Sequence, residues 1–168
     1  VFLPLDITNI DVVQPHGSEV DVTKSENEIY LSKISNRPAF YFVACKPPLD
    51  YSGEGSFWKV TIGAISNDGD GLYLGIIGNL NASEKSYEDS TSCGWTSYRL
   101  IYGENLIFIN GNIVKGHGGW SSEGFTQGEC LFFHLKSNKL TMFSVKKNQK
   151  FTIDVATTVD TYYIHFNM

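Results

Sequence analysis

Alternation of apolar and polar residues recurs along this chain, and it predicts β-strands. The clearest case is residues 56–62, where Trp58, Val60 and Ile62 point to one side of an extended backbone and the residues between them to the other. Trp58 adds a large apolar area for a core. We therefore interpret residues 56–62 as a central strand.

Further strands are predicted along most of the chain, because short apolar or alternating runs are separated by turn residues. Four pairs of runs predict hairpins: 18–23 with 28–33, 56–62 with 72–77, 106–109 with 113–114 across Asn110-Gly111, and 130–135 with 140–145. Single strands are predicted at 39–45, which Pro47-Pro48 closes, and at 98–102, 151–155 and 162–166. No stretch shows a convincing helical period. About a dozen short strands predict an all-β fold, a two-sheet antiparallel β-sandwich.

Two long loops interrupt the strands and favour a sandwich over an up-and-down barrel. Residues 78–92 are mostly polar, with Tyr87 as the main side chain to bury, and they predict a long exposed loop. Residues 115–124 are rich in glycine and include Trp120, which predicts a second, flexible loop.

Composition indicates one globular domain and excludes some partners. Of 168 residues, 42% are hydrophobic and 18% charged, which is enough for a core without disulfide or metal staples. The net charge is -5 and no basic cluster exceeds Lys146-Lys147, so duplex nucleic acid is not expected as a partner. No apolar run approaches the roughly 20 residues that span a bilayer, so no membrane partner is expected.

The cysteines predict the cellular compartment of the protein, and the first residue predicts whether the chain is part of a longer protein. Three cysteines cannot all pair within it, which favours a reducing compartment, and we expect a cytoplasmic protein. The sequence begins at Val1 rather than Met, which indicates a domain excised from a longer protein. Other domains of that parent are therefore expected partners.

Few residue patterns point to chemistry. The four histidines lack zinc-site spacing, and Asp68-Gly69-Asp70-Gly71 is typical of a turn rather than of a calcium loop. Residues 119–124 do not match a nucleophile elbow, and Cys93 and Cys130 look like buried structural thiols. We expect no catalytic residue, no metal and no cofactor. Paired carboxylates for glycoside hydrolysis stay open, because the spacing that matters is spatial.

Several pieces of the sequence occur in an order that is typical of one family. They are Phe57-Trp58-Lys59-Val60-Thr61-Ile62, Leu72-Tyr73-Leu74-Gly75-Ile76-Ile77, Gly94-Trp95, Gly128-Glu129 before Cys130-Leu131-Phe132, and Leu140-Thr141-Met142-Phe143. This order resembles the SPRY family, the β-sandwich at the C-terminus of many tripartite-motif proteins. Leu72 stands where many members have Trp, so the chain resembles a divergent member. The resemblance implies one domain over residues 1–168, with a PRY-like segment over 1–50 and a SPRY-like core over 51–168.

The resemblance also implies a non-catalytic module that recognises a protein or peptide through loops at one end of the sandwich. The substrate-recognition domain of a ubiquitin ligase is such a module. Carried over to this sequence, the family's contact positions are Asn79, Asn81, Tyr87, Tyr98 and Arg99. From the residues alone we add Tyr102, His117 and Trp120, because loop aromatics anchor interfaces. For Tyr98, alternation with Leu100 and Tyr102 favours a core position.

Two other functions fit the residues. Aromatic residues beside Asn and Asp in loops, together with the glycosylation triplet Asn81-Ala82-Ser83, fit a secreted carbohydrate-binding β-sandwich. A glycoside-processing enzyme on a similar sandwich would need two carboxylates about 5 to 10 Å apart in one cleft. Tyr87 and Trp120 fit partner binding and the covering of a sheet edge equally well.

Overall fold

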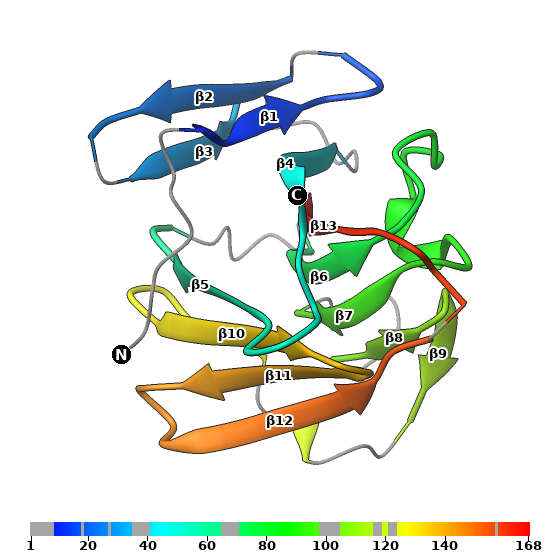
Figure 1. Cartoon of the computed structure of the whole chain (residues 1–168). Helices are drawn as coiled ribbons and strands as arrows, with labels where there is room; N and C mark the ends of the chain where they lie inside the picture. Colours follow the sequence, from blue (N-terminus) through cyan, green and yellow to red (C-terminus); the bar gives the residue numbers. More distant parts are fainter. Residues whose placement is uncertain are drawn as a thin grey trace.

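The computed structural model describes residues 9–17, 19–26, 28–34, 41–64, 71–97, 105–115, 119–120, 124–156 and 158–168. Within these ranges the chain forms thirteen β-strands and a 3-10 turn, η2 (Ser86–Glu88) (Figure 1). The strands are β1 (Asp11–Val13), β2 (Val20–Lys24), β3 (Ile29–Lys33), β4 (Phe42–Leu49), β5 (Ser56–Thr61), β6 (Tyr73–Ile77), β7 (Cys93–Thr96), β8 (Ile107–Ile109), β9 (Asn112–Val114), β10 (Cys130–Lys136), β11 (Lys139–Ser144), β12 (Gln149–Asp154) and β13 (Tyr162–Asn167).

These strands pair antiparallel in two packed sheets and a separate hairpin. The large sheet has seven strands in the order β1-β4-β13-β6-β7-β8-β9, and the small sheet has four in the order β12-β11-β10-β5. β2 and β3 form a two-stranded sheet of their own, which lies at the top of Figure 1, while the small sheet lies at the bottom. The predicted all-β, two-sheet sandwich is confirmed.

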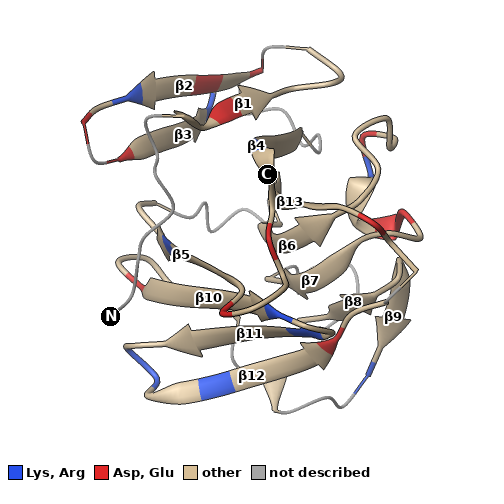
Figure 2. Cartoon of the chain, in the orientation of Figure 1, with Lys and Arg blue, Asp and Glu red and all other residues tan. Residues whose placement is uncertain are grey.

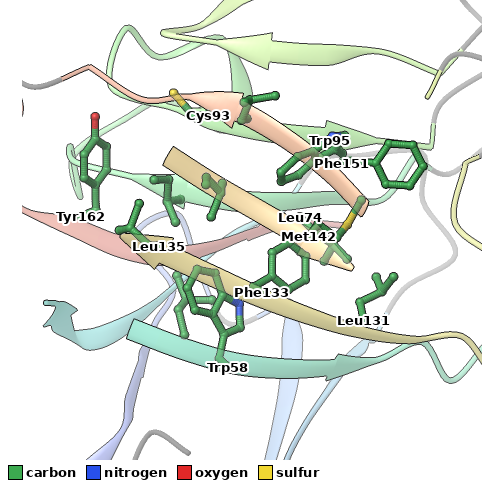
Figure 3. Packing of buried hydrophobic residues seen from close by; sticks show 14 of the residues in the cluster. Trp58, Leu74, Cys93, Trp95, Leu131, Phe133, Leu135, Met142, Phe151 and Tyr162 are labelled. Atoms are coloured by element: carbon green, nitrogen blue, oxygen red, sulfur yellow. The ribbon is translucent and has the colours of Figure 1, made fainter. Parts of the chain in front are cut away.

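The core between the two sheets consists of inward side chains from both (Figure 3). Trp58 of β5 stacks on Phe133, its neighbour on β10, with ring centroids 5.2 Å apart and an interplanar angle of 6°. Phe133 lies 6.1 Å from the ring of Trp95 on β7 in the large sheet. The core position predicted for Trp58 is confirmed, and Phe133 carries its packing across to the large sheet.

One predicted pairing is wrong. β5 lies beside β10 in the small sheet, whereas β6 lies between β13 and β7 in the large sheet, so the expected hairpin of 56–62 with 72–77 does not form. β6 is buried along its whole length, and an interior strand needs a hydrogen-bonding partner on each side. The turn predicted at Asp68-Gly69-Asp70-Gly71 falls outside the described residues except for its last glycine.

β4 continues past its predicted end at Cys45 and includes Pro47 and Pro48. Proline has no N–H group for a ladder hydrogen bond, so it is excluded from regular interior pairing. Both prolines fall where the register with β13 shifts, between the pairs made by Cys45 and Leu49. The strand therefore reaches Leu49 without requiring a hydrogen bond from either proline.

Other predicted hairpins are confirmed. β8 and β9 are joined by Asn110 and Gly111, which have φ angles of 53° and 72° as a tight hairpin turn requires. β10 pairs with β11 across Ser137, which has a φ of 55°, and β2 pairs with β3.

Close packing explains the glycine of the Gly94-Trp95 step. A Cβ atom on Gly94 would lie 2.4 Å from the Leu74 carbonyl oxygen and 2.7 Å from the Tyr73 hydroxyl. The absence of a side chain thus lets the Tyr73 hydroxyl approach the sheet, on the side that faces away from the small sheet.

Candidate interaction surfaces

Among the described residues that were predicted to contact a partner, Trp120 lies apart from the loop that holds Asn79, Asn81 and Tyr87. The loop 78–92 joins β6 to β7 at one end of the large sheet. Ser97 follows β7 at the opposite end, and β9 also ends there, because Val114 pairs with Ile107 next to Trp95. Four of the predicted residues lie outside the described part of the chain, namely Tyr98, Arg99, Tyr102 and His117.

Trp120 is a core residue, and of the two roles predicted for it, partner binding and covering of a sheet edge, its burial argues against the first. Its side chain is fully buried, and its Nε1–H donates to the Thr96 carbonyl oxygen at 3.0 Å. The ring packs edge-on against Phe151 and at a tilt against Phe125, with centroids 5.1 and 4.9 Å away. A tryptophan can be buried in this way when its one polar atom finds an acceptor, even within a glycine-rich segment.

Tyr87 is also largely buried, which agrees with the covering role that the sequence left open for it beside partner binding. It belongs to η2 and packs on the outer side of the large sheet, with ring centroids 6.1 Å from Tyr73 and 5.1 Å from Phe108. Its loop is otherwise mostly polar, but one aromatic side chain is enough to attach a loop to a sheet. The loop is therefore a third layer over the sheet.

A buried hydrogen-bond network holds this loop down. The His165 ring, on β13, contacts the Ser86 Oγ through Nε2 at 2.7 Å and the Ser92 Oγ through Nδ1 at 3.3 Å. Asn167, also on β13, donates from Nδ2 to the Ser86 Oγ at 2.9 Å. All four of these side chains are buried. Two strand residues thereby fix the middle and the end of the loop.

Burial strongly affects the charge of His165. Removal from water lowers its pKa to about 3, and the nearby Asp89 carboxylate opposes this only in part. The imidazole is therefore neutral at pH 7. Neutral imidazole has one donor and one acceptor nitrogen, and the two serine hydroxyls match them because a hydroxyl can serve in either role.

A second set of hydrogen bonds shapes the tip of the loop. Asn79 donates from Nδ2 to Asp89 at 2.8 Å, and its Oδ1 accepts from the Asn81 N–H at 2.9 Å. Asp89 also accepts from the Thr91 N–H and hydroxyl at 2.9 and 2.6 Å. Burial raises the pKa of Asp89, but these hydrogen bonds outweigh burial and lower it below the ordinary value. Asn79 is thus engaged inside the loop, whereas Asn81 is exposed.

The other end of the sandwich contains a buried ion pair that the sequence did not reveal. Lys147 Nζ lies 2.5 Å from the Glu129 carboxylate, and the two side chains are 11% and 0% exposed. Thr126 donates its N–H to the same carboxylate at 2.9 Å, and Ser144 donates its hydroxyl. Burial raises the pKa of Glu129, but these partners together lower it. The Lys147 ammonium also lies 5.9 Å from the Trp120 ring centroid.

The outward side of the small sheet carries exposed and half-buried aromatic residues. In register across its four strands lie Lys59, Phe132, Phe143 and Lys150. Phe132 is 47% exposed. In the next row His134 lies opposite Phe57, and the two rings stack with centroids 3.7 Å apart. We call this side of β5, β10, β11 and β12 the aromatic face.

The alternation in β10 could have revealed this face. Leu131, Phe133 and Leu135 point into the core, so Phe132 and His134 must point outward. An outward phenylalanine next to another on the neighbouring strand is a signal of a binding surface rather than of a core.

Metal centres and membrane-spanning helices are two further kinds of functional element, which the described residues could form only with suitable side chains. Within these ranges no three His, Cys, Asp or Glu side chains are grouped so that they could hold a metal ion. The same part of the chain has no helix with the length and apolarity needed to cross a membrane.

Comparison with known proteins finds similarity in structure only. No protein-family model matches the sequence, and no curated protein matches it. The structure resembles the crystal structure of the SPRY domain of human HERC1 with a TM-score of 0.54 at 10% identity, over 77% of this chain and 75% of that one. The fold is SPRY-like.

A second solved structure is similar to about the same degree. The carbohydrate-binding module CBM66 from Bacillus subtilis matches this SPRY-like fold with a TM-score of 0.53 at 9% identity, over 100% of this chain and 91% of that one. At such identities the likeness concerns the fold alone. The ligand must therefore be argued from the surfaces of this chain.

Proposed function

We propose that this chain is a non-catalytic recognition module that binds a segment of another protein. The observation that carries the proposal is the loop 78–92, which is polar on its exposed side and fixed from beneath by buried hydrogen bonds. A loop of this length without strands is uncommon in a small domain unless it has a function. The resemblance to SPRY domains favours a protein ligand.

Rigidity is the property that makes this loop suited to binding. Ordering a mobile loop on a ligand opposes association, so a loop that is already ordered binds more tightly with the same contacts. Here Ser86 and Tyr87 face the sheet, while Asn81, Lys85 and Glu88 are exposed. Together these three offer amide, ammonium and carboxylate groups to a polar peptide backbone and its side chains.

The proposal keeps the other predicted contact positions. Tyr98, Arg99, Tyr102 and His117 remain proposed contacts. Asn79 makes hydrogen bonds inside the loop, one of them to the Asn81 N–H, so we propose that it affects binding by positioning Asn81. We propose that such a module is part of a longer cytoplasmic protein and recognises substrates for a ubiquitin ligase.

Selection from a random dodecapeptide library displayed on phage, followed by calorimetry with the selected peptide, tests this function. We expect a chain with Asn81→Ala, Lys85→Ala and Glu88→Ala to bind that peptide at least about tenfold more weakly, a loss of roughly 1.4 kcal/mol. The control is Gln127→Ala, an exposed position at the other end of the sandwich. Unchanged affinity of the triple variant would contradict the role of the loop.

The likeness to CBM66 favours a second candidate, a carbohydrate ligand. A glycan array probed with the same chain separates the two functions. Strong glycan binding without any selected peptide would replace the protein ligand by a carbohydrate. Asn81 is exposed, so it could also accept a glycan in a secreted protein.

A further inference from the structure

The proposed function assigns no role to the aromatic face. Loop 78–92 covers the part of the large sheet's outer side that carries Tyr73 and Phe108, whereas Phe132 on the outer side of the small sheet is 47% exposed. Its row ends in an exposed lysine on each side, Lys59 on β5 and Lys150 on β12. Val145, beyond the end of β11, is also exposed. This row is therefore apolar at its centre and basic at both ends, while Asp154 on the outward side of β12 pairs with Lys139 of β11 at 2.8 Å.

A second exposed surface has the opposite charge. On the β2–β3 hairpin, alternation and register place one set of side chains on the outward side, all of them exposed: Glu19, Asp21, Thr23, Glu28, Tyr30, Ser32 and Ile34. Tyr30 is 56% and Ile34 is 61% exposed, and the Tyr30 hydroxyl donates to Glu28. We call this side the acidic hairpin face. Its described residues include three carboxylates and no cation.

The two faces are complementary but belong to separate parts of the molecule. Figure 1 places the hairpin at the top and the small sheet at the bottom. In Figure 2 β2 carries an acidic position and a lysine, β5 carries a lysine, and β12 carries a lysine and an acidic position at its end. One copy of the chain cannot bring its own two faces together in this fold. A second copy can, with Tyr30 against Phe132 and carboxylates against lysines.

We propose that the acidic hairpin face of one copy docks on the aromatic face of a second copy. Contact between two aromatic faces would bring lysines together, and contact between two hairpin faces would bring carboxylates together, so opposite charge selects the mixed arrangement. The mixed contact is head-to-tail, and it leaves one free face of each kind for further copies. Filaments or short rows of domains are the resulting assemblies.

The size of the hairpin predicts a weak contact. The seven outward side chains named above are far fewer than the roughly 20 to 30 residues per partner of a standard interface, so association is expected only at high protein concentration. Exposed charges attract less strongly in salt, so association must also weaken as ionic strength rises. In a longer parent protein that forms oligomers, high local concentration would strengthen such a contact.

Sedimentation velocity on the chain at about 0.01 to 1 mM, in low and high salt, tests the proposal. The unmodified chain is expected to associate with rising concentration in low salt. Reversal of the face charges by Lys59→Glu with Lys150→Glu, or of the hairpin charges by Glu19→Lys with Asp21→Lys, should weaken association at least about tenfold. All four positions are exposed, so folding should survive, which circular dichroism checks.

Mixing the two charge-reversed proteins gives the decisive result. Each alone repels its own copies, but the mixture presents opposite charges at both contacts, so association should return. Ile113→Ser, which removes an exposed apolar residue of β9, is the control and should associate like the unmodified chain. A chain that stays monomeric at every concentration, or a mixture that does not associate, would overturn the proposal. Neither result would bear on peptide binding by loop 78–92.

Discussion

Replacing Lys147 by Met will lower the free energy of unfolding by about 3 to 5 kcal/mol at pH 7, because it leaves a buried carboxylate without its cation. Glu129 is fully buried, and Lys147 is its cationic partner among the described residues, at 2.5 Å. The remaining donors, from Thr126 and Ser144, are neutral. Neutral groups cannot offset the cost of keeping that charge away from water.

Denaturation by urea, with the free energy extrapolated to water, measures this effect. Adding Glu129→Gln to the Lys147→Met variant should recover part of the loss, since the double variant has no buried charge. Lys139→Met is the matched control on the same sheet. Its partner Asp154 is 2.8 Å away, but both side chains are well exposed, so a loss below about 1 kcal/mol is expected. Equal losses for Lys147→Met and Lys139→Met would contradict the buried ion pair.

Lowering the pH from 7 to 4 will destabilise the protein through His165. The pKa of this ring is about 3 in the folded chain, against an ordinary value of 6.5, because burial disfavours the charged form. Below pH 6.5 the unfolded chain binds a proton at this residue and the folded chain does not. The stability that the neutral ring contributes is complete above pH 6.5 and is lost as the pH falls toward 3, by about 1.4 kcal/mol per pH unit.

Urea unfolding at a series of pH values, for the unmodified chain and for His165→Gln, measures this slope. Glutamine keeps a neutral hydrogen-bonding side chain but cannot be protonated in this range. The variant should therefore be less stable at pH 7 yet lose much less stability between pH 6.5 and 4. His134→Gln, which removes a histidine from the outward side of β10, controls for the loss of a histidine elsewhere. An identical pH slope in His165→Gln and the unmodified chain would show that the ring is not buried in neutral form.

The sequence predicted strands well and their partners less well. Asn110-Gly111 identified the β8–β9 turn because that dipeptide adopts the required positive φ angles within the turn itself. The pairing of β5 with β10 joins residues that are about seventy positions apart, so no local pattern specified it. The turn signals after β5 were mistaken for a hairpin because a turn does not determine which sheet the next strand joins.

The candidate site was predicted less well, for a related reason. A polar composition predicted that loop 78–92 is exposed, but Ser86 and Tyr87 face a sheet whose partner residues, such as His165, come much later in the chain. The glycine-rich segment around Trp120 left its burial undecided, because Thr96, which accepts its N–H inside the core, is distant from it in the sequence. The aromatic face, in contrast, was readable from the alternation in β10.

We propose above that loop 78–92 is a rigid binding surface for a protein segment. Amide chemical shifts of the isotope-labelled chain, recorded as the selected peptide is added to a dilute sample, test it most directly. We predict that the shifts change at residues 80–90 and that the amides bonded inside the loop, such as those of Asn81 and Thr91, exchange slowly with solvent before the peptide is added. Shift changes confined to the small sheet, or loop amides that exchange at the rate of an unfolded chain, would contradict the account.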